Sequence, residues 1–416
     1  MFLNNQFMHD SFLYATNENF HNVFRMIIQM KEFVQEDILQ KALNTAIIRY
    51  PYLSVKVIQT KEGYDVVKND QPMIVYHGFE APYLGTKETN EHLIAVGYEE
   101  NTIFIDCYHS LTDGNGITPF AKTLLYYYLC DSLDKPLNPT GIVRLEDPMD
   151  DEEINDPTSK IKDYPSQPIY EYKPEECFHI TEKDKETTHL LKIDEQSFME
   201  HSMSKDSSPN AALAAMFYKV LLQHHEVDQP IVAGVAMTTR QALDAEKSYT
   251  NLVSLLNLKY TSDMKDFDLL KLGTLGRGMM FLQSQPENVL YGIKNRQKLV
   301  DYLASLPNDE ARQKAYYEMI LRMKALDTFF ISYTGKKDWG AVESYIDSIY
   351  VLSPNGADCF GINVYVINHT FGIAINQNFE SDRYVKSFIN LLEEENVSYT
   401  YEGKIPLELS KVKVIG

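Results

Sequence analysis

Thr102-Ile103-Phe104-Ile105-Asp106-Cys107-Tyr108-His109-Ser110-Leu111-Thr112-Asp113-Gly114 is the most informative stretch of this sequence. Residues 102–108 are rich in β-branched and aromatic side chains, which predicts a strand. Thr118 supplies a capping hydroxyl and Pro119 suits a first helical position, so we expect a helix to begin at Pro119. The His-x-x-x-Asp-Gly motif of residues 109–114 therefore lies in a strand-to-helix connection.

His109 has the clearest chemical use in this loop. An imidazole titrates near neutral pH, so a neutral His109 can take a proton from a hydroxyl or amine that attacks a carbonyl. Asp113, if it is buried and ionised, needs a partner, and either a salt bridge to an Arg or contact with substrate would provide one. Gly114 and Gly116 allow backbone conformations or close approaches that a side chain would prevent. The alternative interpretation is an exposed histidine in a solvated loop.

Four segments that occur in a fixed order carry a family resemblance. They are residues 23–27, 38–44, 49–57 and 108–114. This order resembles the chloramphenicol-acetyltransferase-like superfamily of acyltransferases, which includes condensation domains of nonribosomal peptide synthesis. Stand-alone bacterial proteins described as alcohol acetyltransferase-like are the most similar group. The resemblance covers the first 130 residues well and extends to the rest only through the order of elements and scattered positions.

The resemblance implies an α/β fold with mixed sheets, arranged as two lobes with an active-site channel between them. We expect a first lobe at residues 1–130, an acidic, proline-rich linker at 131–185 and a second lobe at 186–416. A chain of 416 residues with 44% apolar content is long enough for two cores. The acidic run at residues 150–153 is expected to be solvated surface, because charge runs usually are.

The sequence departs from the superfamily pattern at two positions. Condensation domains usually carry a second histidine where this chain has Tyr108, although the catalytic position is kept. The Arg that often follows the early Pro-x-Leu motif is replaced by Ser54. We therefore expect Arg240, after the strand-like residues 231–239, to be the partner of Asp113. An arginine that faces water at the end of a strand is the alternative.

The resemblance implies acyl transfer without a bound cofactor, a metal or a covalent acyl-enzyme. An acyl-coenzyme A, or a phosphopantetheine thioester on an acyl or peptidyl carrier protein, would donate to a small-molecule hydroxyl or amine, with ester formation favoured over amide formation. The motif residues expected to serve catalysis, with His109 as general base, are His109, Asp113 and Gly114. The side chains that could stabilise the oxyanion are Asn257, Ser332 and Tyr333. A catalytically weakened protein that binds a carrier protein or an acylated metabolite is the alternative.

Composition excludes several classes of function. A net charge of −20 argues against nonspecific binding to nucleic acid or anionic membranes. The four cysteines, Cys107, Cys130, Cys177 and Cys359, lack metal-ligand spacing and are expected to be reduced thiols; a nucleophilic Cys107 is a minor alternative. The sequence shows neither a signal peptide nor a membrane-spanning run, so we expect a cytoplasmic monomer.

Two further motifs suggest nucleotide or phosphate binding only weakly. Residues 273–278 are rich in glycine but lack phosphate-loop spacing, and we expect them to be a flexible interruption of a helix over residues 267–283. Lys336 and Lys337 could meet the phosphates of an acyl donor, although an exposed turn with two lysines is the simpler interpretation.

Overall fold

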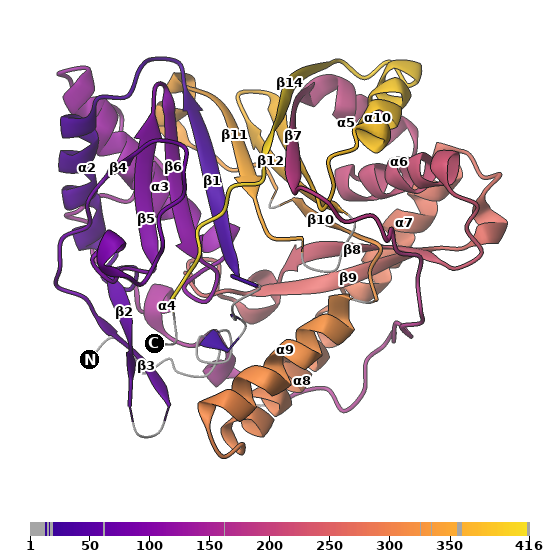
Figure 1. Ribbon diagram of the computed structural model, residues 1–416, viewed down its shortest axis with the longest axis horizontal. Helices are drawn as coiled ribbons and strands as arrows, with labels where there is room; N and C mark the ends of the chain where they lie inside the picture. Colours follow the sequence, from indigo (N-terminus) through magenta and orange to yellow (C-terminus); the bar gives the residue numbers. More distant parts are fainter. Residues whose placement is uncertain are drawn as a thin grey trace.

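The computed structural model describes residues 13–14, 16, 20–60, 63–161, 163–324, 326–333, 335–355 and 360–413. Two large sheets dominate the molecule (Figure 1). The first has five strands, in the spatial order β11 (Ile346–Leu352), β1 (Val23–Met30), β6 (Thr102–Tyr108), β5 (Ile94–Glu99) and β4 (Tyr76–His77). Helices α2 (Glu36–Arg49) and α3 (Gly114–Ser132) pack against each other beside this sheet.

The second sheet has seven strands. Their spatial order is β14 (Tyr399–Pro406), β7 (Thr187–Asp194), β13 (Thr370–Gln377), β12 (Phe360–Ile367), β10 (Phe329–Tyr333), β8 (Ile231–Thr238) and β9 (Val253–Tyr260). The helices that accompany it are α5 (Glu195–Ser204), α6 (Pro209–His224), α7 (Leu269–Gln283) and α10 (Arg383–Glu394). Each sheet contributes to its own large apolar core. The prediction of a two-lobed α/β fold with mixed sheets is confirmed.

Strand β11 ties the two lobes together. It comes late in the chain, yet it pairs antiparallel with β1 in the first sheet, with Met26 opposite Val351. On its other side it packs against β12 and β13 of the second sheet. Gly372 of β13 lies so close to the carbonyl oxygen of Ile349 that any side chain there would collide with it. The cavity described below therefore opens between two sheets that are in direct contact.

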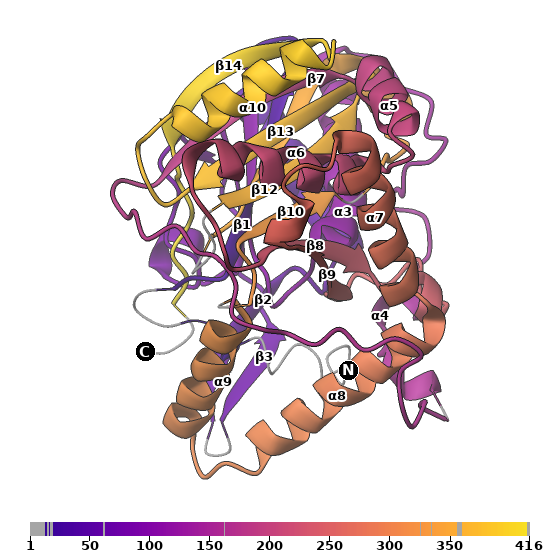
Figure 2. The same cartoon turned by 90° about the vertical axis from the view of Figure 1, so that its right-hand side faces the viewer.

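Other elements lie outside the two sheets. A separate hairpin consists of β2 (Val55–Gln59) and β3 (Tyr64–Lys68), and β5 and β6 form another hairpin within the first sheet. Helices α8 (Pro286–Ala304) and α9 (Asp309–Lys324) project below the sheets (Figure 2). No sequence pattern had indicated α8. The short 3₁₀ helices are η1 (Lys87–Thr89), η2 (Pro157–Lys160), η3 (Gln241–Leu243), η4 (Ser262–Met264) and η5 (Gly340–Tyr345).

The expected start of the helix after the histidine motif is wrong. Helix α3 begins at Gly114, and Pro119 lies inside it. The Asp113 carboxylate accepts hydrogen bonds from the backbone N–H groups of Asn115 and Gly116, at 2.9 Å each. These groups have no partner within the helix, so the carboxylate cap stabilises a start five residues earlier than the proline suggested.

Two further expectations are corrected. Helix α7 runs without interruption through residues 273–278. A Cβ at Gly273 would lie 2.8 Å from the Ser207 side chain, and one at Gly276 would lie 2.7 Å from the Tyr260 hydroxyl. These two glycines therefore serve close packing and do not interrupt the helix.

The acidic run at residues 150–153 is not merely solvated surface. It leads into the short helix α4 (Asp151–Ile154), and the Glu153 carboxylate binds the guanidinium of buried Arg49 at 2.7 and 2.9 Å. Glu152 accepts from the backbone N–H of Lys247 at 2.8 Å. The run therefore connects the first lobe to the segment that precedes β9.

Candidate active site

A cavity of about 550 Å³ lies between the two lobes. Phe24 and His109 line it from the first lobe, and Met237, Leu256 and Phe330 line it from the second. Most of its lining is apolar, with a few polar groups among the aliphatic and aromatic side chains. The volume and the apolar lining of this cavity are typical of sites that bind small organic molecules.

His109 stands at the end of β6 and contributes to the cavity wall while remaining partly buried. Its backbone N–H donates to the Asn22 carbonyl at 2.8 Å, and its ring meets that of Phe24 edge-on at a centroid distance of 5.1 Å. Burial lowers the pKa of His109 below the usual 6.5, because a charged imidazolium is poorly solvated there. The imidazole is therefore neutral at physiological pH, which is the form that can accept a proton.

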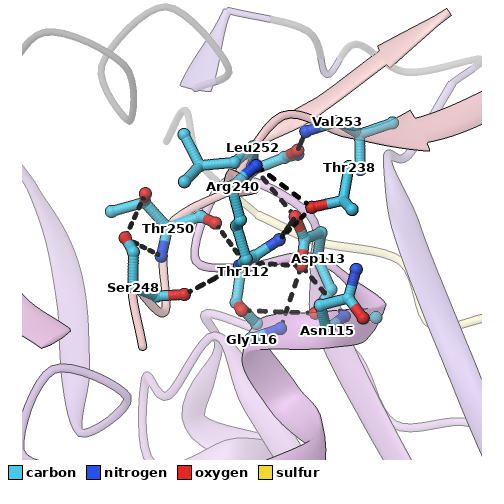
Figure 3. A network of polar contacts seen from close by, with 12 residues as sticks. Thr112, Asp113, Asn115, Gly116, Thr238, Arg240, Ser248, Thr250, Leu252 and Val253 are labelled. Atoms are coloured by element: carbon cyan, nitrogen blue, oxygen red, sulfur yellow. Dashed lines mark hydrogen bonds and ion pairs between the residues drawn. The ribbon is translucent and has the colours of Figure 1, made fainter. Parts of the chain in front are cut away.

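Asp113 forms a buried ion pair with Arg240. The two guanidinium N–H groups donate to the two carboxylate oxygens at 2.8 and 2.9 Å, and the residues are only 1% and 5% exposed (Figure 3). Asp113 Oδ2 also accepts from the backbone N–H of Leu252 at 2.9 Å. Asp113 is thus fully engaged in holding the loop together, and its carboxylate has little capacity left for a substrate.

The segment from Ser248 to Leu252 is bound to this ion pair. Arg240 donates to the carbonyl of Ser248 at 3.0 and 3.1 Å and to that of Thr250 at 2.8 Å. The next residue, Asn251, places its Nδ2 atom 2.8 Å from Nδ1 of His109 and 3.1 Å from the carbonyl oxygen of His109. Sequence reasoning missed Asn251, because it lies 142 residues from His109 and no local pattern marks it.

The two glycines of the motif have different surroundings. Gly114 is the first residue of α3 and lines the cavity. At position 116 the backbone of Tyr249 comes so close that only glycine fits, because a Cβ there would collide with the Tyr249 carbonyl oxygen. Thr112 donates to the same carbonyl at 2.6 Å. Gly116 therefore lets the loop of the first lobe meet the segment of the second.

The three side chains considered for the oxyanion have different positions. Ser332 and Tyr333, at the end of β10, line the cavity. Asn257 is not among the residues that line it; its backbone N–H and carbonyl bind the Gln283 side chain of α7 at 2.9 and 2.8 Å. The structure therefore keeps Ser332 and Tyr333 beside the cavity and places Asn257 outside it.

The residues beside His109 in sequence serve the core. Tyr108 is fully buried, and its hydroxyl accepts from Thr16 at 3.0 Å and donates to the Leu13 carbonyl at 3.2 Å. Cys107 is also fully buried, and burial raises its pKa well above the usual value, so its thiol stays protonated. A nucleophilic thiolate at Cys107 has no support from these surroundings. Cys359 lies outside the described residues.

Lys336 and Lys337 follow β10 and have different environments. The Lys336 ammonium binds both carboxylate oxygens of Glu195, at 2.8 and 2.9 Å. Lys337 is half-buried, and desolvation lowers its pKa, with the Arg240 cation lowering it further. The positive charge of Lys336 is therefore already paired with the carboxylate of Glu195.

Within the described ranges, no cluster of three or more His, Cys, Asp or Glu side chains is placed to bind a metal ion. The helices in those ranges include none with the length and apolar content needed to cross a membrane.

Neither a protein-family model nor a curated protein matches this sequence. Solved structures do match over nearly the whole chain. The TRI101 protein of F. sporotrichioides, crystallised with coenzyme A and T-2, superimposes with a TM-score of 0.61 at 11% identity, over 94% of this chain and 98% of that one. Polyketide synthase associated protein 5 from Mycobacterium tuberculosis gives 0.60 at 14% identity, over 94% and 97%. The first condensation domain of the CDA synthetase gives 0.57 at 10% identity, over 95% and 94%.

The chain has the chloramphenicol-acetyltransferase-like fold. Acetyltransferases and condensation domains of nonribosomal peptide synthesis share this fold, as the resemblance in the sequence implied. At 10 to 14% identity, the similarity establishes the architecture.

Proposed function

We propose that this protein is an acyltransferase that moves an acyl group from a thioester to the hydroxyl or amine of a small molecule. The observation that carries the proposal is the position of His109, a neutral imidazole in the wall of a mainly apolar cavity between two lobes. The cavity can exclude water from the reacting groups, which protects the thioester from hydrolysis.

In the proposed reaction His109 acts as general base. It takes the proton from the acceptor as the acceptor oxygen or nitrogen bonds to the thioester carbonyl carbon, which forms a tetrahedral oxyanion. The carbon–sulfur bond then breaks, and the imidazolium returns the proton to the leaving thiolate. Base catalysis of this kind contributes about 10²–10⁴ in rate, so positioning and oxyanion stabilisation must supply the rest.

Ser332 is the side chain we favour as oxyanion donor, with Tyr333 second. Both line the cavity that His109 also lines, and both stand at the end of the same strand. A hydroxyl that donates to the developing negative charge contributes about 10²–10³ in rate. Asp113, Arg240 and Gly114 shape the loop that carries His109 and do not take part in proton transfer.

Acyl-coenzyme A is the donor we favour. Structural neighbours of the same fold were crystallised with coenzyme A, which supports this choice, while neighbouring condensation domains leave a carrier-bound phosphopantetheine thioester as a second source. The apolar wall favours an acceptor with a substantial hydrocarbon body.

The test is thiol release from acyl-coenzyme A donors of several chain lengths, with pooled alcohols and amines. The proposal predicts acceptor-dependent release by the wild type that falls by about 10²–10⁴ in His109→Ala. His77→Ala, on an exposed part of the chain, is the matched control and should keep full activity. No release from coenzyme A thioesters or from acylated carrier protein would reject acyl transfer and favour a protein that only binds such molecules.

A further inference from the structure

One wall of the cavity carries three polar side chains next to one another. Ser332 of β10 and Asn363 of β12 are partners in the parallel register of these strands, so their side chains point to the same side of the sheet. Ser353, which follows the end of β11, places its hydroxyl oxygen 3.0 Å from Nδ2 and 3.3 Å from Oδ1 of Asn363. All three residues line the cavity, whose surface is otherwise mainly apolar.

Asn363 has hydrogen-bonding capacity that the protein does not use. It is the only amide side chain in β12, and it is just 2% exposed. An amide has two N–H donors and an oxygen with two lone pairs. Among the described residues the Ser353 hydroxyl is its only partner, so at least one N–H and one lone pair of this amide have no protein partner. A buried amide in this state costs folding free energy that an aliphatic side chain would not cost.

A second buried asparagine, Asn376 of β13, shows what a structural amide looks like in this fold. Its Nδ2 donates to the Ser353 carbonyl at 3.1 Å, and its Oδ1 accepts from the Thr188 hydroxyl at 2.8 Å. Both ends of this amide are used within the protein, and Asn376 is not among the residues that line the cavity. Asn376 therefore holds the backbone of Ser353, whereas Asn363 is left to bind a molecule in the cavity.

We propose that Asn363 recognises a second polar group of the substrate, a hydroxyl close to the reacting carbonyl. Neighbouring strands lie about 4.8 Å apart, and four single bonds of an extended chain span about 5 Å. With the oxyanion at Ser332, a hydroxyl on the β-carbon of the acyl chain would reach Asn363. A hydroxyl beside the nucleophile of the acceptor is the other source of the same chemistry. This inference rests on the proposed acyl transfer and on Ser332 as oxyanion donor.

Two matched substrate pairs distinguish these sources. The donor pair is octanoyl-coenzyme A and β-hydroxyoctanoyl-coenzyme A, with hexanol as acceptor. The acceptor pair is octanol and the vicinal octanediol, with acetyl-coenzyme A as donor. We expect the wild type to favour the hydroxylated member of one pair by about 10–10² in kcat/KM, because the plain member leaves the buried amide unpaired. In Asn363→Leu, which removes the polar group at similar volume, this ratio should fall to about one.

A control variant and a stability measurement separate recognition from a structural role. Met237→Leu, an apolar exchange in the same cavity, should keep both ratios at their wild-type values, whatever it does to the individual rates. Asn363→Leu should unfold at the wild-type temperature or above it, because leucine needs no hydrogen-bond partner. Strong destabilisation with equal losses for both members of a pair would show a structural role and overturn the proposal. An absence of preference in the wild type, or an unchanged preference in Asn363→Leu, would also overturn it.

Failure of the proposed function gives a different result. If no protein releases thiol with either pair, acyl transfer is rejected, and calorimetric titration of the same four molecules tests recognition alone. Tighter binding of a hydroxylated member by the wild type, lost in Asn363→Leu, would support Asn363 as the group that recognises the hydroxyl. Equal affinities within each pair would reject that role.

Discussion

Asp113 and Arg240 meet across the two lobes, 127 residues apart in the chain, in a bidentate ion pair that is almost completely buried. The pair also binds the backbone of the segment that carries Asn251. One interaction thus sets the start of α3, the shape of the histidine loop and the approach of the second lobe.

Breaking the ion pair should cost far more stability than breaking a surface pair. Arg240→Ala leaves the Asp113 carboxylate buried without its cation, and we expect a loss of about 3–5 kcal/mol in the free energy of unfolding. Lys41→Ala, which breaks an exposed pair with Asp131, should cost less than about 1 kcal/mol. Chemical denaturation of the two variants measures the difference. Equal, small losses would mean that the pair does not organise the fold.

Two helical glycines should respond to alanine in opposite directions. Gly116→Ala forces a methyl group into the Tyr249 backbone, and overpacking of this kind costs about 1–3 kcal/mol. Gly278 in α7 has no neighbour within 4 Å of its added Cβ, so Gly278→Ala should stabilise the protein by about 0.5–1 kcal/mol through helix propensity. Thermal unfolding of both variants shows whether the stability falls in Gly116→Ala and rises in Gly278→Ala. Stabilisation by Gly116→Ala would contradict the close approach described here.

The pH dependence of acyl transfer should reflect the environment of His109. Burial lowers the pKa of this imidazole below 6.5, so the neutral base persists to lower pH than a free histidine would. We expect the acid limb of kcat/KM to fall below pH 6.5. A limb centred above that value would show that the imidazolium is favoured in the protein and would contradict this assignment. Initial rates from pH 4.5 to 8, with donor and acceptor both well below saturation, provide the measurement.

His189 should make the protein sensitive to acid. Burial lowers its pKa to about 4, and its Nδ1 lies 2.8 Å from the Tyr401 hydroxyl. Between pH 6.5 and 4 the unfolded chain binds a proton that the folded protein does not, so stability falls as the pH drops through this window, by up to about 3 kcal/mol.

His189→Gln should remove this proton-linked part of the loss. The decline in unfolding midpoint from pH 6.5 to 4 should become shallower in that variant, while His77→Gln, at an exposed position, should follow the wild-type curve. Identical pH curves for His189→Gln and wild type would show that this histidine does not control acid stability.

The cavity should set the size of the substrate. Ala236 lines it from β8, and Ala236→Phe would place a ring in the space of the hydrocarbon body. We expect kcat/KM for long acyl donors or bulky acceptors to fall by at least about tenfold, with acetyl transfer to small acceptors less affected. Ile48→Phe, at an exposed position of α2 that does not line the cavity, is the control. A uniform loss with every substrate would argue that the cavity does not select by size.

Local patterns in the sequence determined the elements around the site. The β-branched run before His109 predicted β6, and its hairpin with β5 is present because strand propensity and turn residues act between near neighbours. The prediction that the helix begins at Pro119 was wrong because it relied on the Thr118 hydroxyl and the proline, and it did not consider Asp113 as the capping residue. That carboxylate caps the helix five residues earlier, in a conformation held by an arginine far along the chain.

The sequence by itself determined the histidine motif, the two-lobed α/β architecture implied by its resemblance, and Arg240 as a partner to consider for Asp113. Only the tertiary structure decided which side chains meet. It brought Asn251 to His109, placed Ser332 beside the cavity and Asn257 outside it, and put β11 into the first sheet. The physical reason is that these contacts join residues 100 or more positions apart, whose approach depends on the packing of whole sheets and helices and leaves no periodic trace in the sequence.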